Sequence, residues 1–129
     1  MYKNIVLIVL MVFIGYFMAL FGPWWAPLLS CFLIGGLKLR TGVGGFLFGA
    51  IAMLLLWLGM ALYLERMDGT GLSARVGDIF VASIPAFNSL GGSGLIYLLL
   101  SLMAVLLGGL ATLSGVLFAR FFGLDKRTD

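Results

Sequence analysis

Long apolar runs separated by short polar interruptions dominate the amino-acid sequence. A hydrocarbon core about 30 Å thick requires roughly 20 apolar residues from each helix that crosses it. On this basis the runs predict transmembrane helices at residues 4–22, 24–37, 43–64 and 95–119. We therefore expect an all-α membrane protein in which residues 1–129 form a single transmembrane domain, a small bundle of four helices.

The second run is the weakest of the four. Residues 24–37 extend only about 21 Å at 1.5 Å per residue, so this helix must stand upright, thin the bilayer or enter it without crossing. Pro23 and Pro27 suit the beginning of a helix, and Trp24 and Trp25 are typical anchors at the headgroup interface. The sequence still favours a crossing here, because a crossing gives the more uneven distribution of Lys and Arg between the two sides of the membrane.

Lys and Arg are distributed unevenly between the two sides that four crossings would create. One side would hold Lys3, Lys38, Arg40, Arg120, Lys126 and Arg127. The other side would hold only Arg66 and Arg75. Cytoplasmic loops are enriched in Lys and Arg, so this distribution predicts that both termini are cytoplasmic. A re-entrant second helix would move Lys38 and Arg40 across and weaken the bias.

The polar segment between the last two runs, residues 65–94, contains one further helical pattern. Residues 72–83 predict a short amphipathic helix on the outer membrane surface, capped by Thr70 or Ser73. Its apolar face comprises Leu72, Val76, Ile79 and Phe80, and its polar face carries Arg75 and Asp78. Because a connection of this length is usually functional or flexible, we expect an external partner to contact it.

An alternative interpretation places a binding or catalytic site in the same segment. Glu65, Asp68 and Asp78 would then gather around a cation or substrate, although their spacing matches no calcium-binding loop. An enzyme acting on lipid would in addition need Arg75 to converge with these carboxylates. Charged residues in a solvated loop are common without either role, so we expect neither.

Composition narrows the chemistry further. The chain is 63% hydrophobic and 10% charged, which identifies lipid as its solvent. The formal net charge of +3 comes without any run of more than two basic residues, so no nucleic-acid partner is expected. Histidine is absent and Cys31 is the only cysteine. The commonest neutral-pH acid/base group and an intramolecular disulfide are therefore excluded.

None of the four runs contains a charged residue. Ion-coupled transporters and intramembrane proteases usually carry ionisable residues inside the bilayer. The polar side chains of the runs include Ser30, Cys31, Ser101, Thr112 and Ser114, with Tyr16 and Tyr63. Without a neighbouring base or metal the hydroxyls are poor nucleophiles, so we expect no catalytic residue, no cofactor and no metal ion.

Two stripes of small residues predict close helix packing, because helices in lipid associate where small side chains let the backbones approach. In the fourth run the stripe comprises Ser101, Ala104, Gly108, Ala111, Thr112, Gly115 and Ala119. In the third run it comprises Gly42, Gly45, Gly49, Ala52 and Gly59, interrupted by Leu56. We expect the stripes to pack on each other, and docking of one stripe on another protein is the alternative.

Four short motifs carry a resemblance. They are PWW before the second run, GFLFGAIAMLLLWLGMALY in the third, LSARVGDIF in the polar segment and GGLATLSG in the fourth. With them the chain resembles a group of small, uncharacterised four-span inner-membrane proteins of the Bacteroidota. The similarity covers most of the chain and implies a bacterial inner-membrane location. No activity is assigned to that group, so the resemblance transfers no functional residue.

These observations together favour a non-enzymatic accessory or structural subunit of a larger bacterial inner-membrane complex, docked through small-residue helix faces. The alternative is a small homo-oligomeric channel or transporter whose path forms between protomers and is lined by Gly, Ser and Thr. The expected partners are bilayer lipids together with other membrane subunits or further copies of the chain. A closed ring with a hydrated centre would favour the channel.

Overall fold

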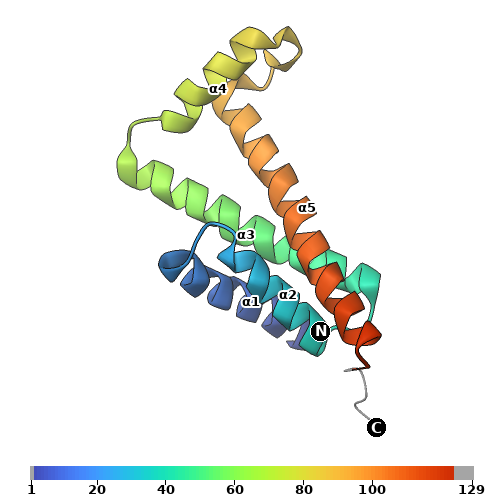
Figure 1. Cartoon of the computed structure of the whole chain (residues 1–129). Coiled ribbons are helices and arrows are strands. Elements are labelled where there is room, and N and C mark those ends of the chain that lie inside the picture. The colour runs from blue at the N-terminus through green and yellow to red at the C-terminus, as the bar shows by residue number, and fades with distance from the viewer. Residues whose placement is uncertain (1, 124–129) are drawn as a thin grey trace. The chain divides into compact units, whose positions relative to one another are not determined.

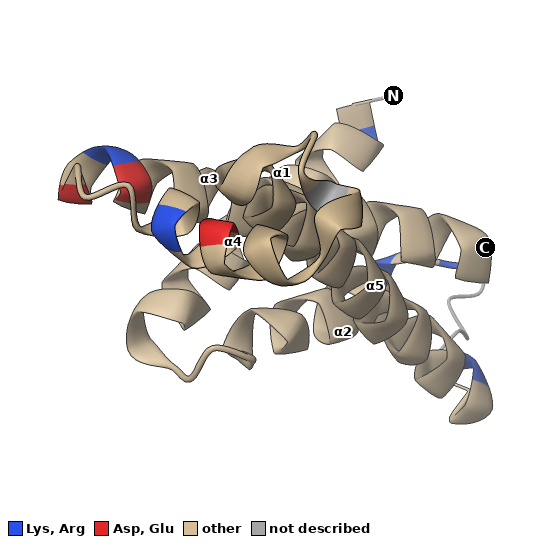
Figure 2. Ribbon diagram, turned by 90° about the horizontal axis from the view of Figure 1, so that it is seen from above, with Lys and Arg blue, Asp and Glu red and all other residues tan. Residues whose placement is uncertain are grey.

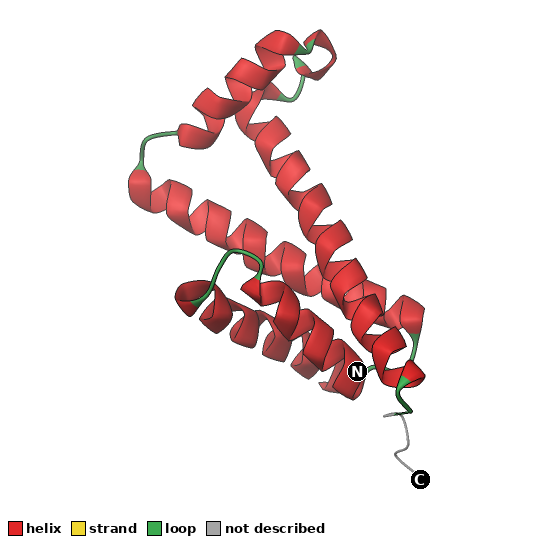
Figure 3. Ribbon diagram, viewed as in Figure 1, coloured by secondary structure: helices red, strands yellow, loops and turns green. Residues whose placement is uncertain are grey.

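A computed structural model describes residues 2–123, and every regular element in that range is helical (Figure 3). The elements are α1 (Tyr2–Phe21), α2 (Ala26–Lys38), α3 (Gly42–Asp68), α4 (Leu72–Ser83), the 3-10 helix η1 (Pro85–Phe87) and α5 (Gly91–Phe121). Helices α1, α3 and α5 have 20, 27 and 31 residues and are apolar enough to cross a membrane. The chain is therefore an all-α, multi-pass membrane protein by helix length and hydropathy, as the sequence predicts.

Helix α2 is the exception among the apolar helices. Its 13 residues fall short of the length that a full crossing normally needs. Pro27 lies in its first turn and is buried, and the preceding Trp24 and Trp25 are exposed, as expected of anchors in the headgroup layer. The fourth crossing therefore stays a prediction.

Helices α3 and α5 extend furthest beyond the apolar runs from which they were predicted. Helix α3 continues through Glu65 to Asp68, and α5 begins at Gly91 and not at Leu95. Hydrogen bonds within a helix satisfy the main chain in water as well as in lipid, so a helix does not have to end where the hydrocarbon ends. Hydropathy therefore predicted the apolar part of each helix and not its termini.

The described residues form two compact units, and helices α3 and α5 contribute to both. The first unit comprises residues 2–56 and 104–123, which contain α1, α2, the beginning of α3 and the end of α5. The second unit comprises Trp57–Met103, which contains the remainder of α3, then α4 and η1, and the beginning of α5. Each unit has its own internal packing.

In the first unit, α1 and α2 form a hairpin (Figure 1). Residues from three helices, Met11, Ile34 and Ala52, form a buried cluster. Leu7 near the start of α1 and Leu39 just after α2 pack against the same cluster. The beginning of α1 therefore lies at the same end of the first unit as the end of α2.

The end of α5 is tied to that same end of the first unit. The guanidinium of Arg120 donates a hydrogen bond to the carbonyl oxygen of Arg40, in the connection between α2 and α3. Charged residues lie near helix ends and on α4, whereas the long apolar stretches contain none (Figure 2). Lys126 and Arg127, which contribute to the predicted charge bias, lie outside the described residues.

Thr112 lies at the centre of the contact among α2, α3 and α5. It is fully buried, and its Oγ1 donates to the carbonyl oxygen of Gly108 at 2.9 Å. A Cβ added to Gly35 of α2 would lie 2.7 Å from the Thr112 carbonyl oxygen. One added to Gly49 of α3 would contact Thr112 Oγ1 and the carbonyl oxygen of Gly108. The helices therefore approach at backbone distance, which larger residues at these positions would prevent.

The same approach continues along α2 and α5. A Cβ on Gly36 would lie 2.9 Å from the carbonyl oxygen of Gly115, and one on Gly115 would contact the carbonyl oxygen of Phe32. The ring of Phe32 in α2 packs against that of Phe118 in α5 with centroids 5.7 Å apart. The first unit is thus held together largely by glycine against backbone.

Candidate functional site

The stripes of small residues predicted in the third and fourth runs face the interior of the first unit for most of their length. The buried members are Gly45, Gly49, Ala52, Ala104, Gly108, Thr112, Gly115 and Ala119. Ala111 is half-buried, and Leu56, which interrupts the pattern in the sequence, is buried against Gly15 of α1. Gly59, in the second unit, is exposed and has nothing within 4 Å of an added Cβ. The buried residues are therefore occupied by contacts within the chain.

The hydroxyl groups of α5 are directed back to their own helix. Ser101 donates to the carbonyl oxygen of Tyr97 at 2.7 Å, and Ser114 donates to that of Leu110 at 2.7 Å. Thr112 does the same toward Gly108. Such bonds satisfy the hydroxyl donors locally.

In the second unit, α4 has the bounds that the sequence predicts, Leu72–Ser83, and packs through its smallest residue. Gly77 is its only buried residue. A Cβ on Gly77 would contact the carbonyl group of Gly92 in α5 and lie 2.5 Å from the Gly92 Cα atom. One on Gly92 would contact the main-chain nitrogen and Oδ1 of Asp78. The carboxylate of Asp78 therefore lies against the first turn of α5, where the helix dipole favours negative charge.

The large side chains predicted for the apolar face of α4 remain exposed. They are Leu72, Val76, Ile79 and Phe80, of which Ile79 is 69% and Phe80 49% exposed. Because Gly77 makes the closest contact, the helix lies near α5 without covering these side chains. An amphipathic helix with its apolar face open is typical of a helix in the membrane interface or against a partner.

The start of α4 differs from the prediction. Neither Thr70 nor Ser73 caps the helix, because the N-cap position is taken by Gly71, whose φ of +60° lies in the left-handed region. Ser73 Oγ instead donates to Oε1 of Glu65 in α3. The hydroxyl thus ties α4 to the end of α3, and glycine supplies the backbone conformation that a side chain would disfavour.

A partly open pocket of about 340 Å³ lies between α3, α4 and α5, entirely within the second unit. Its apolar walls are formed by Ala61, Leu64, Leu72, Val76, Ile96 and Leu100. Its polar groups are Glu65, Asp68, Thr70, Ser73 and Tyr97. Small-molecule sites are mainly apolar concavities of about 300 to 1,000 Å³ with a few polar groups. This pocket, which the sequence did not predict, has that character.

Tyr97 is the polar residue of the pocket that sequence reasoning overlooked. Its hydroxyl is buried and has no hydrogen-bond partner among the described residues. Buried hydroxyls are normally paired, so this group marks a place that requires an acceptor or donor. The only signal for it in the sequence is a tyrosine inside an apolar run near the polar segment, which distinguishes it poorly from an interface anchor.

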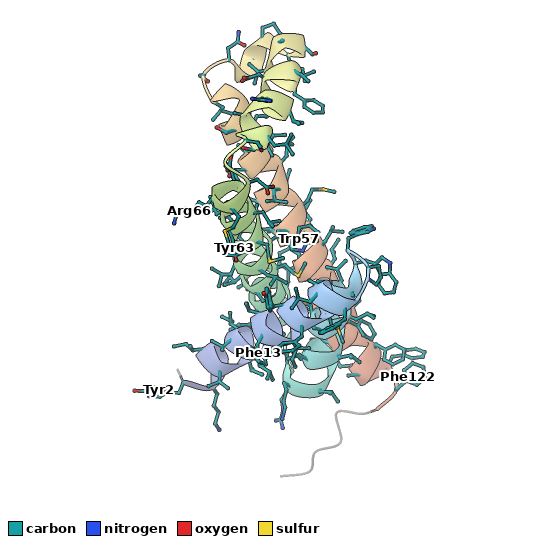
Figure 4. All side chains as sticks on the ribbon, turned by 90° about the vertical axis from the view of Figure 1, so that its left-hand side faces the viewer. Tyr2, Phe13, Trp57, Tyr63, Arg66 and Phe122 are labelled. Atoms are coloured by element: carbon teal, nitrogen blue, oxygen red, sulfur yellow. The ribbon has the colours of Figure 1, made fainter. Side chains whose placement is uncertain are left out.

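The pocket brings together only part of the charged set that a cation site or a lipid enzyme would need. Glu65 and Asp68 line it, whereas Arg75 and Asp78 do not. Arg66 extends away from the α3 ribbon (Figure 4). Within residues 2–123 no three His, Cys, Asp or Glu side chains are grouped so that they could hold a metal ion. The lining therefore carries two carboxylates and no cationic side chain.

Cys31 does not extend this site, because its thiol is buried in the first unit.

No protein-family profile, curated protein sequence or solved structure matches this chain. Function must therefore be inferred from the surfaces and the pocket themselves.

Proposed function

We propose that the chain is a non-enzymatic accessory subunit of a larger inner-membrane complex in bacteria. In this proposal the first unit anchors the chain in the bilayer, and the exposed end of α4, around Ile79 and Phe80, contacts the partner. The observation that carries the proposal is the exposure of these two large apolar side chains on a helix of 12 residues that is too short to cross a membrane.

The packing of the first unit supports this division of roles. The stripes that could have formed a docking seam are mostly buried against the chain's own helices, so we assign the docking surface to α4. Exposed apolar side chains gathered on one short polar-flanked helix are characteristic of interaction sites. The homo-oligomeric channel receives less support, because the hydroxyls of Ser101, Thr112 and Ser114 are bonded to their own helix.

Crosslinking in cells tests the proposed contact. A photoactivatable residue in place of Ile79 or Phe80 should give one reproducible protein adduct, because the partner would cover these positions. The same residue at Phe13, an exposed position on α1, serves as the control and should give no such adduct. Purification in mild detergent with mass spectrometry then identifies the protein crosslinked at α4.

The proposal would be abandoned if both α4 positions gave no protein adduct while the purified chain eluted alone. A defined homo-oligomer with adducts only between copies of the chain would instead favour the channel. The double substitution Ile79→Asn with Phe80→Asn gives an independent readout. It should abolish co-purification of the partner and leave the first unit folded.

The proposed topology has both termini in the cytoplasm and four crossings. One end of the first unit holds the start of α1, the end of α2 and Arg120 beside Arg40. This arrangement supports the proposed topology. Four of the eight Lys and Arg residues occur at this end of the first unit, namely Lys3, Lys38, Arg40 and Arg120. Cytoplasmic sides are enriched in such residues.

Labelling of single cysteines should verify this topology. In a Cys31→Ala background, a cysteine at Thr41 should react with a membrane-impermeant maleimide only after the cytoplasmic side is opened. Cysteines at Trp24 and Asn88 should react in intact spheroplasts, because they would lie on the other side. Labelling of Trp24→Cys and Thr41→Cys from the same side would show that α2 does not cross.

A further inference from the structure

We propose that the pocket of the second unit binds a membrane lipid with a primary ammonium headgroup. The apolar walls would hold the upper part of an acyl chain, and the carboxylates of Glu65 and Asp68 would receive the ammonium. This site is separate from the proposed contact of Ile79 and Phe80 with a partner, because neither of these two residues lines the pocket.

The order of apolar and polar groups along α3 supports a lipid over a soluble ligand. Ala61 and Leu64 lie in the apolar run, and Glu65 and Asp68 follow at its end. The pocket therefore changes from apolar to polar at the end of the apolar run, where hydrocarbon is expected to give way to headgroups. A lipid has the same order along its length.

The charge of the lining selects the headgroup. Two carboxylates and no Lys or Arg line the pocket, so an anionic headgroup would be repelled and a cationic group attracted. Carboxylates accept hydrogen bonds and do not donate them when ionised. A primary ammonium supplies three N–H donors, and charge-assisted bonds of this kind are stronger than neutral ones. A quaternary ammonium has no such donor and a larger radius.

Ser73 and Tyr97 complete the recognition of the headgroup. Ser73 Oγ donates to Glu65 Oε1, which holds that carboxylate at the junction of α3 and α4. Tyr97 lines the pocket, and its hydroxyl is buried without a partner among the described residues. A lipid that displaces the side chains covering this hydroxyl would offer it a phosphate or ester oxygen as an acceptor. The ligand would thus satisfy the polar group that the protein alone leaves unpaired.

Lipid binding to the purified full-length chain tests the proposal. Native mass spectrometry would compare added phosphatidylethanolamine, phosphatidylcholine and phosphatidylglycerol of identical acyl chains. We expect phosphatidylethanolamine to bind about tenfold more tightly than the other two, because only its headgroup combines charge with N–H donors. Equal binding of phosphatidylcholine or phosphatidylglycerol would overturn the proposal.

Substitution of Tyr97 separates a binding role from a structural one. Tyr97→Phe removes only the hydroxyl and should weaken phosphatidylethanolamine binding about three- to tenfold. The melting temperature of the lipid-free protein should not fall, because the lost group has no partner to leave unpaired. Tyr63→Phe, at a 57% exposed position of the same unit that does not line the pocket, is the matched control and should bind normally.

Substitution of Glu65 tests the charge. Glu65→Gln keeps an acceptor for Ser73 and should abolish the preference for phosphatidylethanolamine over phosphatidylcholine. An unchanged preference in this variant, or equal losses in Tyr97→Phe and Tyr63→Phe, would refute the site. If Glu65→Gln fails to fold, the Tyr97 pair still decides the outcome. Because no partner protein is involved, failure of this proposal is distinguishable from failure of the proposed subunit role.

Discussion

Replacing Gly49 with alanine is expected to destabilise the first unit more than any other single-methyl change on α3. The added Cβ would contact both Thr112 Oγ1 and the carbonyl oxygen of Gly108. Overpacking of a well-packed core costs about 1 to 3 kcal/mol, and we expect the upper part of this range because one of the contacted atoms belongs to the backbone. The helices would have to separate to accommodate the methyl group.

The matched control lies on the same helix. Gly59 has nothing within 4 Å of an added Cβ, so Gly59→Ala brings no steric conflict. Alanine is preferred to glycine inside a helix by roughly 0.5 to 1 kcal/mol, which predicts a small gain in stability. The two variants therefore change the same residue type on one helix and should shift stability in opposite directions.

Thermal unfolding in mild detergent, followed by circular dichroism, would measure both variants. Cys31 provides a second reporter, because its thiol is buried in the first unit and reacts with a maleimide only when that unit opens. Gly49→Ala should lower the melting temperature and accelerate labelling of Cys31, and Gly59→Ala should do neither. Equal melting temperatures would show that α3 and α5 do not meet at backbone distance.

A second substitution tests which atoms oppose the methyl group. Thr112→Ala would remove Oγ1 from the neighbourhood of Gly49 but leave the carbonyl oxygen of Gly108 in place. The double variant Gly49→Ala with Thr112→Ala should therefore recover only part of the lost stability. Because the two residues are in contact, their effects should not add. Full recovery would indicate that the carbonyl oxygen of Gly108 does not obstruct a methyl group at position 49.

Sequence patterns predicted the helices of this protein better than they predicted its pocket. The periodicity of Leu72 to Phe80 predicted α4 with the bounds Leu72–Ser83, because apolar and polar residues that alternate with the period of a helix indicate an amphipathic helix. The small-residue pattern in α3 and α5 likewise indicated faces that are buried in the first unit for most of their length. Both features depend on residues close together in the sequence.

The features that the sequence did not predict depend on segments far apart. Gly35 and Gly36 pack against α5, but two glycines in a short apolar helix have no periodicity to indicate a face. The pocket joins Glu65, Ser73 and Tyr97 from three helices, and nothing local to any of them indicates that meeting. The local sequence around Ser73 is compatible both with a helix cap and with a hydrogen bond to Glu65. It therefore could not indicate which of the two the hydroxyl makes.

Replacing Gly92 with alanine is expected to release α4 from α5. An added Cβ would lie 2.5 Å from the carbonyl oxygen of Ala74 and contact the main-chain nitrogen and Oδ1 of Asp78. Gly77→Ala should act in the same way from the other helix, because its Cβ would contact the carbonyl group of Gly92. Overpacking of about 1 to 3 kcal/mol should raise the open population of α4 about 5-fold to 150-fold.

Limited proteolysis with trypsin would measure this release. Arg75 lies within α4, so cleavage after it requires local opening of the helix. Arg66, in α3, is the only other basic residue between Trp57 and Met103 and provides a reference site. Cleavage after Arg75 should accelerate in Gly77→Ala and Gly92→Ala, whereas the reactivity of Cys31 should stay low because the first unit is unaffected.

The control for α5 is Gly94→Ala. Its added Cβ would meet only the Leu90 Cβ atom at 3.8 Å, an ordinary contact, so trypsin should cleave this variant at the normal rate. Equal cleavage of Gly92→Ala and Gly94→Ala would contradict the close approach of α4 and α5.

Release of α4 should also affect the pocket, because it removes Leu72, Ser73 and Val76 from the lining. Gly77→Ala and Gly92→Ala should then lose preferential phosphatidylethanolamine binding without any change to the carboxylates that receive the headgroup.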